Sequence, residues 1–358
     1  MILGVSGPRS ANLLVTGTCN LSCEHCTVRS QGPLQEDMTI RQWSSVVDKL
    51  VEGRLLEATV TGGEPLCRPD IIELLQVLLR KPARINLNTN GILLSDDMIA
   101  ELESLPSRFG FLMVSLDGSR PEIVDSIRGR GTYRQLHRAL ERLKDSLLEY
   151  GFYCTLSTKN LKDICGILGI AREHDTWIKF NPLVPSGPRI PRYLLLSPGE
   201  LAKAGQILLR ERREMGAKVL GTVVNCAMNL ERAGQLESKE NTGDGPSRSI
   251  GFGCGGGLNK LSVFPNGDAT PCDHLPGVVL GNLRHQELDA VLNSPANAEF
   301  RNFVNRGREN VEGCANCECA GICLGGCPVI PYNRFSRDGR DTLSCLKLIG
   351  AGVREAGR

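Results

Sequence analysis

Residues 12–26 of the chain read NLLVTGTCNLSCEHC, so a short apolar strand at 13–15 leads directly into a cysteine-rich loop. Five more β-rich apolar runs follow, at 58–60, 85–87, 112–116, 152–156 and 178–180. Segments with the apolar period of a helix lie between the runs, at 40–51, 71–80, 96–104, 133–150 and 161–174. Such alternation predicts parallel strands joined by right-handed crossovers. We therefore expect an α/β fold, a partial (β/α)6 TIM-like barrel, with its site at the carboxyl ends of the strands.

Beyond these elements the character of the sequence changes. A further helix is expected at 198–215, and the stretch 234–250 is polar and rich in Gly, Ser and Lys. After it, an Asn-Gly turn at 266–267 between two apolar runs predicts a β-hairpin in a loop-rich, cysteine-dense region. We predict a barrel domain over 1–233, a linker over 234–250 and a second domain over 251–358, in which metal centres replace part of a hydrophobic core.

Composition excludes several classes of protein. A net charge of +2 and 41% hydrophobic residues give no field or surface that would favour nucleic acid or a membrane. The first ten residues lack the pattern of a signal peptide, so we expect a cytoplasmic protein. Fifteen cysteines are unusual, and in a reducing compartment thiols at short spacings bind metal more often than they form disulfides.

The first cysteine group, Cys19, Cys23 and Cys26, has the spacing C-x3-C-x2-C. Three thiolates leave one iron of a [4Fe–4S] cubane without a protein ligand, and that iron can bind a substrate or cofactor. The alternative is a structural zinc site, which would recruit His25 as its fourth ligand.

At these residues the chain resembles the radical S-adenosylmethionine (SAM) superfamily. The resemblance implies that Cys19, Cys23 and Cys26 hold the SAM-binding cluster and that Gly62, Gly63 and Glu64, of the sequence GGEP, contact the amino group of SAM. Asn90 in NTNG, Ser115 and Asp117 in SLDG, and Arg128 also look like the family's SAM contacts. Strand-end turns and an exposed arginine at the start of a helix are the ordinary alternatives. His25 departs from the aromatic residue that many members carry.

The second cysteine group resembles the seven-cysteine SPASM pattern of a subset of this superfamily. In relatives such cysteines hold two auxiliary [4Fe–4S] clusters, which gives three clusters in all. The resemblance assigns one cluster to Cys314, Cys317, Cys323 and Cys345, and the other to Cys254, Cys272 and Cys327. This last set lacks a fourth cysteine, so its cluster has an open iron or borrows Cys226 or Cys319.

Two residues are candidates for a catalytic role. Asp273 follows Cys272 in a Pro-Cys-Asp sequence that is similar to the proposed proton acceptor of sulfatase-maturating relatives, and a turn-capping role is the alternative. Cys154 lies in the predicted strand 152–156 and, if it faces inward, could donate a hydrogen atom to a substrate radical.

The resemblance implies a radical SAM oxidoreductase or maturase that cleaves SAM to a 5′-deoxyadenosyl radical and abstracts a substrate hydrogen. A flavodoxin- or ferredoxin-type protein is the expected electron donor. The expected substrate is a side chain of a peptide or protein. The twelve residues before the first strand are too few for a leader-peptide recognition domain, so a separate recognition protein is the expected partner. The alternatives are dehydrogenation or epimerisation of a sugar or aminocyclitol, and a non-enzymatic electron-transfer protein.

Overall fold

The computed structural model describes residues 7–28, 36–187, 189–225, 228, 254–305, 311, 314, 317 and 326–332. Its strands form one sheet in the order β10-β9-β8-β1-β2-β3-β4-β5-β6-β7. The strands are β1 (Ser10–Leu14), β2 (Glu57–Thr61), β3 (Arg84–Thr89), β4 (Phe109–Ser115), β5 (Tyr150–Leu156), β6 (Trp177–Pro182), β7 (Val219–Leu220), β8 (Lys260–Val263), β9 (Asp268–Thr270) and β10 (Gly281–Asn282).

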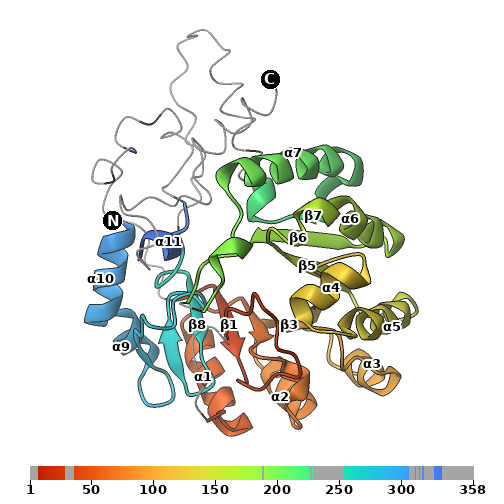
Figure 1. Ribbon diagram of the computed structural model, residues 1–358. Coiled ribbons are helices and arrows are strands. Elements are labelled where there is room, and N and C mark those ends of the chain that lie inside the picture. Colours follow the sequence, from red (N-terminus) through yellow and green to blue (C-terminus); the bar gives the residue numbers. More distant parts are fainter. Residues whose placement is uncertain are drawn as a thin grey trace, which may run out of the picture.

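Strands β1 to β7 pair in parallel and in chain order, as a partial barrel requires. Helices cover the outer side of this curved sheet (Figure 1). The helices are α1 (Ile40–Glu52), α2 (Ile71–Leu79), α3 (Asp96–Glu103), α4 (Pro121–Arg128), α5 (Thr132–Lys144), α6 (Ile164–Glu173), α7 (Pro198–Met215), α9 (Leu288–Leu292), α10 (Pro295–Val304) and α11 (Val329–Tyr332). The predicted strands of the barrel and its fold class are thereby confirmed.

The expected hairpin is also confirmed, and it joins the barrel sheet. β8 and β9 are antiparallel around a turn in which Gly267 has φ +93°, a conformation that favours glycine. β8 pairs in parallel with β1, so that Asn12 lies opposite Ser262. Strands from both sides of the predicted linker therefore share one sheet, while the linker itself, 234–250, lies outside the described residues.

One helix prediction was wrong at its end. The sequence predicts a helix over 133–150, but α5 ends at Lys144 and Tyr150 already belongs to β5. Leu147, which continues the apolar spacing of this helix, is 92% exposed. After Lys144 the Leu147 amide donates a hydrogen bond to the Glu103 carboxylate of the neighbouring helix, so local contacts override the apolar period. Helix α4 and the short strand β7 were not predicted.

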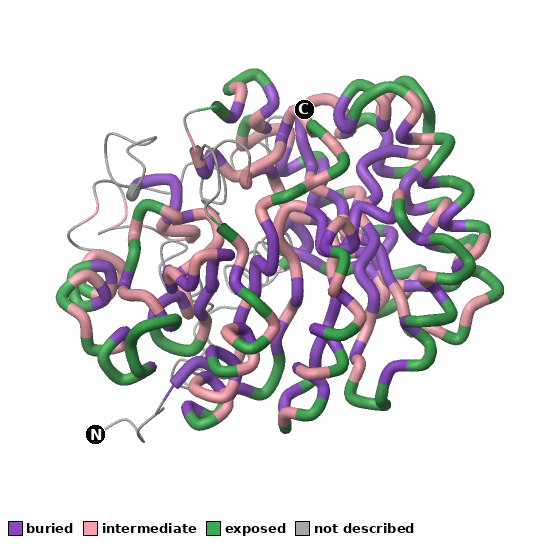
Figure 2. The backbone as a smooth tube through the Cα atoms, turned by 90° about the horizontal axis from the view of Figure 1, so that it is seen from below, coloured by how far each residue is buried: buried purple, intermediate pink, exposed green. Residues whose placement is uncertain are grey.

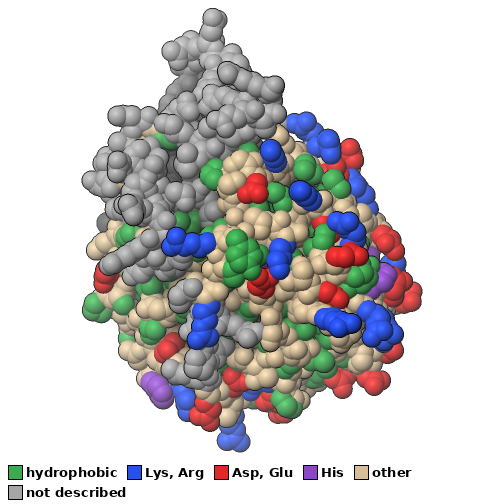
Figure 3. All heavy atoms as spheres, viewed as in Figure 1, with side chains coloured by type: hydrophobic (Ala, Val, Ile, Leu, Met, Phe, Trp, Pro, Cys, Tyr) green, Lys and Arg blue, Asp and Glu red, His purple; other side chains and the backbone are tan. Residues whose placement is uncertain are grey.

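The core lies between the sheet and its helices (Figure 2). Trp43, Leu50, Leu74 and Leu78 are fully buried on the inner faces of α1 and α2. Helix α1 begins with a capping box in which Thr39 and Gln42 exchange side-chain and backbone hydrogen bonds. In the described residues no helix has the length and apolar character needed to span a membrane. On the described part of the face in Figure 3, basic and acidic side chains are interspersed, as expected for a net charge of +2.

Candidate active site

The inner face of the barrel encloses a cavity of about 480 Å³. Successive strands contribute alternate residues to its wall, because every second side chain of a strand points to the same face. Inward-facing residues of the strands are Asn12, Thr59, Asn88, Met113, Tyr153, Lys179, Asn181 and Lys260. Their neighbours in sequence, such as Leu13, Phe152 and Phe180, are buried in the core on the other side. This cavity brings together most of the residues that the sequence singles out.

We call the carboxyl-terminal end of the cavity the rim, defined by Cys19, Cys23, Cys26, Glu64, Asn90, Asp117 and Arg128. We call the opposite part the floor, defined by Tyr153, Lys179, Lys260 and Asp273. All of these residues except Asp117 line the cavity.

The three thiols of the first cysteine group line the rim. The loop that carries them is shaped by local contacts: the Leu21 amide donates to Cys19 Sγ at 3.4 Å, and the Cys26 amide donates to the Cys23 carbonyl. Burial raises the pKa of the Cys19 thiol and raises that of Cys23 to about 11, although Arg128 acts in the opposite direction on Cys23. A metal ion bound here would deprotonate these thiols, because cysteine binds metals as a thiolate.

The position of His25 bears on the zinc alternative. In the described residues no three His, Cys, Asp or Glu side chains form a ligand group for a single metal ion. His25, the fourth ligand that a zinc site would need, instead directs Nε2 at Asp117, 3.0 Å away.

Glycines 62 and 63 allow the second motif to pack against the cysteine loop. A Cβ atom at Gly62 would lie 2.5 Å from the Thr16 carbonyl oxygen, and one at Gly63 would lie 2.2 Å from that of Thr18. Gly62 also has φ +147°, which other residues rarely adopt. Any side chain at either position would push the GGEP loop away from the loop of Cys19, which explains the residue type at both positions.

Glu64 is the centre of a hydrogen-bond network at the rim. Its carboxylate accepts bonds from the Thr89 hydroxyl at 2.7 Å, the Asn90 amide at 2.6 Å and the Leu66 amide at 3.1 Å. Burial raises its pKa, although these donors act against the shift. Asn90 in turn donates to Asn20 Oδ1 in the cysteine loop at 2.8 Å. Glu64 thus ties β3 to the cysteine loop, and its expected contact with the SAM amino group stays a prediction.

Asp117 lies behind the cavity wall and is completely buried. It forms an ion pair with Arg128 at 2.6 Å and accepts a bond from the Thr155 amide at 2.9 Å. Although burial acts to raise the pKa of this carboxyl, Arg128 and His25 hold it well below its usual range. Asp117 therefore orients Arg128, which lines the cavity, and links it to the cysteine loop through His25. Ser115 also lines the cavity.

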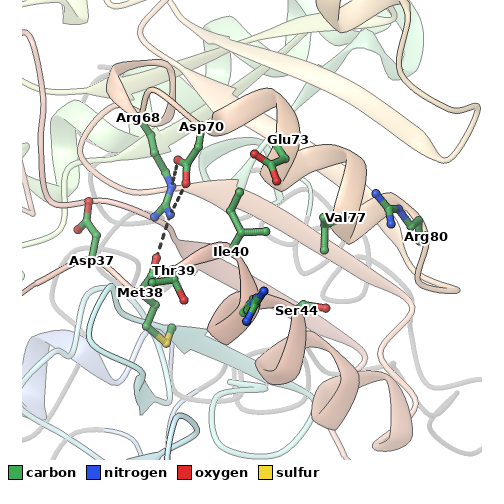
Figure 4. Close-up of a pocket in the computed structure, with 11 residues that line it drawn as sticks. Asp37, Met38, Thr39, Ile40, Ser44, Arg68, Asp70, Glu73, Val77 and Arg80 are labelled. Carbon is green, nitrogen blue, oxygen red and sulfur yellow. Dashed lines mark hydrogen bonds and ion pairs between the residues drawn. The ribbon is translucent and has the colours of Figure 1, made fainter.

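A second pocket lies on the outside of the barrel, between α1 and α2 (Figure 4). At its inner end the buried Arg68 pairs with Asp70 and donates to the carbonyls of Val15 and Met38. These bonds fix the end of β1 and the entry to α1 relative to the GGEP loop. The central arginine of this pocket is occupied by these structural contacts.

The floor carries Asp273, one of the two candidate catalytic residues. Asp273 Oδ1 accepts a hydrogen bond from Asn12 Nδ2 at 3.1 Å. Burial acts to raise the pKa of Asp273, but the nearby His274 and Lys260 hold it below its usual value. The carboxylate is therefore ionised at neutral pH and faces the cavity, where it can accept a proton.

The structure describes only part of the second cysteine group. Cys272 and Cys327 line the cavity beside Asp273, while Cys254 lies nearby with Arg301 donating to its carbonyl at 3.0 Å. Burial raises the pKa of Cys272 well above the ordinary thiol value. Cys314 and Cys317 are described, with the Cys317 amide donating to the Cys314 carbonyl at 3.2 Å. Cys226, Cys319, Cys323 and Cys345 lie outside the described residues.

Cys154 is placed on the outer face of β5. It is fully buried in the hydrophobic core, where Asn160 Nδ2 donates to its sulfur at 3.7 Å. Its neighbours Tyr153 and Thr155 line the cavity instead. The thiol of Cys154 therefore does not face the cavity, which was the condition for a role as hydrogen donor.

Sequence reasoning missed Asn12 and the floor residues Tyr153, Lys179 and Lys260. The alternation of strands could have found them, since inward positions of β5 and β6 follow once one residue of each strand is placed. It also missed the ion pair between Asp117 and His25, which joins residues from different loops.

Comparison with known proteins agrees with this geometry. The family model of the radical SAM superfamily matches residues 13–169, and that of an iron–sulfur cluster-binding domain, SPASM, matches residues 254–318. An AdoMet-dependent heme synthase of Methanosarcina barkeri is 27% identical over 91% of this chain and 93% of its own length. The mycofactocin maturase MftC of Mycolicibacterium smegmatis is 24% identical over 99% and 87%.

Among solved structures, Streptococcus suis SuiB bound to the precursor peptide SuiA superposes with a TM-score of 0.75. The match covers 95% of this chain and 76% of SuiB, at 16% identity. At that identity the likeness establishes a shared fold.

Proposed function

Since the chain belongs to the radical SAM superfamily and carries a SPASM domain, we propose that it oxidises a side chain of a peptide or protein, with Asp273 as the proton acceptor. The observation that carries this proposal is the shared cavity: the thiols of Cys19, Cys23 and Cys26 at the rim and the Asp273 carboxylate at the floor line the same space. A substrate between them would meet the radical source and the base at once.

The cofactors fit the residues present. Cys19, Cys23 and Cys26 would hold the SAM-binding cluster, with Gly62, Gly63, Glu64, Asn90, Ser115 and Arg128 around SAM and Asp117 behind them. Cys254, Cys272 and Cys327, together with Cys314, Cys317, Cys323 and Cys345, would hold two auxiliary clusters. When bound, the SAM-binding cluster and SAM supply a 5′-deoxyadenosyl radical that takes a hydrogen atom from the substrate.

The chain's own residues then orient substrate and move a proton. The bond from Asn12 fixes the Asp273 carboxylate toward the cavity, and the depressed pKa keeps it ionised. Loss of a hydrogen atom followed by loss of a proton and an electron oxidises the substrate by two electrons. The proton goes to Asp273, and an auxiliary cluster, which Cys254, Cys272 and Cys327 would hold, would supply the acceptor for the electron. Arg128, held by Asp117, offers a cation at the rim for a carboxylate of SAM.

A peptide substrate is supported by two relatives. MftC is named as a maturase, and SuiB binds a precursor peptide. A second candidate is a tetrapyrrole, since the heme synthase of M. barkeri matches nearly the whole chain. A separate leader-recognition protein and a flavodoxin- or ferredoxin-type donor remain the proposed partners.

The test is a paired product assay. Anaerobically reconstituted protein receives SAM, dithionite and the short peptides encoded beside its gene, and peptide mass and 5′-deoxyadenosine are measured separately. Asp273→Asn should suppress the modified peptide by about a hundredfold, the lower range for a lost general base, and leave 5′-deoxyadenosine formation intact. Asp289→Asn, an exposed aspartate of α9, is the control and should behave as the wild type.

Full product from Asp273→Asn would remove the aspartate as the base. No modified peptide from the wild type, with turnover of a porphyrin instead, would replace the peptide by the tetrapyrrole.

A further inference from the structure

We propose that the floor of the cavity is a carboxylate-binding subsite, in which Lys179 and Lys260 hold an anionic group of the substrate. This inference rests on the proposed function, because it concerns the substrate of the same cavity. It names the chemistry of one end of that substrate.

The two lysines reach the cavity from strands on opposite sides of the barrel. Lys179 is the third residue of β6 and faces inward between the buried Ile178 and Phe180. Lys260 is the first residue of β8, opposite Ser10 of β1. Both side chains line the cavity. In a sheet the inward positions are set by the strand alternation, so neither lysine can turn to the outer face without a shift of register.

Several buried or half-buried cations of the described barrel have acidic partners, while Arg9 and Arg212 donate to backbone carbonyls. Arg68 pairs with Asp70, Arg128 with Asp117, and Lys159 with Glu24. Lys179 and Lys260 form no ion pair or side-chain hydrogen bond within the part of the chain that the structure describes; Lys179 lies over the Tyr153 ring, with Nζ 6.0 Å from the ring centroid. Cations held in a partly desolvated space without a counter-ion are costly, which points to a ligand that supplies one.

Charges around the floor leave room for an anion. The groups that act on Lys179 are Lys260, Asp273 and Glu57. Glu57 is exposed at the amino end of β2, so among the described residues of the floor two ammonium groups face one carboxylate, that of Asp273. Burial, and then the charge of Lys260, lower the pKa of Lys179, so a bound anion would relieve both lysines.

Tyr153 completes the subsite. Its phenol oxygen accepts a hydrogen bond from Asn181 Nδ2 at 3.0 Å, which leaves its own O–H to donate. Burial raises the pKa of this phenol, so it stays protonated at neutral pH. Two ammonium groups and one O–H donor match the acceptor sites of a carboxylate. A substrate anchored there would extend toward the rim, and its length would select the C–H bond that the radical reaches.

The test is protection of the lysines from carbamylation by cyanate, followed by peptide mass spectrometry on the holoprotein. Three acids serve as probes: glutarate, the capped pentapeptide Ala-Gly-Glu-Gly-Ala, and coproporphyrin III. Their amide counterparts, glutaramide, the glutamine peptide and the porphyrin tetra-amide, are matched controls. Lys203, exposed on α7, is the internal reference for the reagent.

We expect at least one acid to slow labelling of Lys179 and Lys260 several-fold, its amide to have little effect, and Lys203 to be unchanged. In Lys179→Met the protection of Lys260 by the same acid should fall. Equal protection by acid and amide, no protection by any acid, or failure of cyanate itself to reach either lysine would overturn the subsite.

The three acids also test this inference separately from the proposed peptide substrate. Protection from labelling reports binding alone and does not require the protein to turn over a substrate. Protection by the glutamate peptide supports a peptide carboxylate as the source. Protection by the porphyrin but not by the peptide would keep the subsite and count against a peptide substrate.

Discussion

The rim and the floor of the cavity differ in whether their charged side chains have partners within the described chain. At the rim, Asp117 pairs with Arg128 and His25, and Glu64 accepts three hydrogen bonds from the chain itself. At the floor, the ammonium groups of Lys179 and Lys260 have no such partners among the described residues. A rim that is satisfied internally is already organised before any ligand arrives. In the proposed function, this difference separates a cofactor region at the rim from a substrate region at the floor.

The largest effect should come from the cysteine loop. Replacing Cys19, Cys23 and Cys26 together by Ala should abolish conversion of SAM to 5′-deoxyadenosine, because the rim loses every thiol ligand of its cluster. The iron content of the reconstituted protein should fall from that of about three clusters per chain to that of about two. Cys165→Ala, at an exposed cysteine of α6, is the control and should change neither value. Wild-type SAM cleavage by the triple variant would disprove the assignment of the rim.

The next effect concerns the rim's buried ion pair. Asp117→Asn leaves the guanidinium of Arg128 buried without its counter-ion, which should cost roughly 3–5 kcal/mol of unfolding free energy. SAM binding should weaken as well, since Arg128 loses its orientation. Urea unfolding and a SAM binding isotherm measure the two effects.

The control is Glu122→Gln, at an exposed position of α4, the helix that carries Arg128. Its free energy of unfolding should remain within about 0.5 kcal/mol of the wild-type value. If Asp117→Asn is as mild as this control, the rim is not organised by the pair, and the contrast with the floor disappears.

The smallest effect separates the two faces of β5. Cys154→Ala should cost about 1 kcal/mol through a smaller core side chain and leave substrate modification unchanged, because the thiol faces away from the cavity. The matched change is at Tyr153, the neighbour that faces the cavity. Tyr153→Phe removes the phenol hydroxyl at the floor and should raise the KM for substrate, while SAM cleavage without substrate continues. Loss of product in Cys154→Ala, without loss of folded protein, is the result that would return the thiol to the mechanism.

Much of the fold followed from local pattern. The six barrel strands and the hairpin around Gly267 have periods and turn residues that are visible in a few adjacent positions. The end of α5 did not follow, because Leu147 continues the helical apolar spacing and only its contact with Glu103 shows that the helix has stopped. The parallel pairing of β8 with β1 could not be predicted either, since it joins residues from distant parts of the chain.

By itself, the sequence determined the radical SAM and SPASM assignment, because cluster ligands must lie at fixed short spacings that the chain displays directly. It also determined the barrel class, because the strand–helix alternation repeats along the chain. Only the tertiary structure decided which side chains share the cavity. Adjacent residues of a strand point to opposite faces, so Cys154 and Tyr153 differ entirely in role, and the meeting of Asp117 with His25, or of Lys179 with Lys260, depends on how distant strands close around one space.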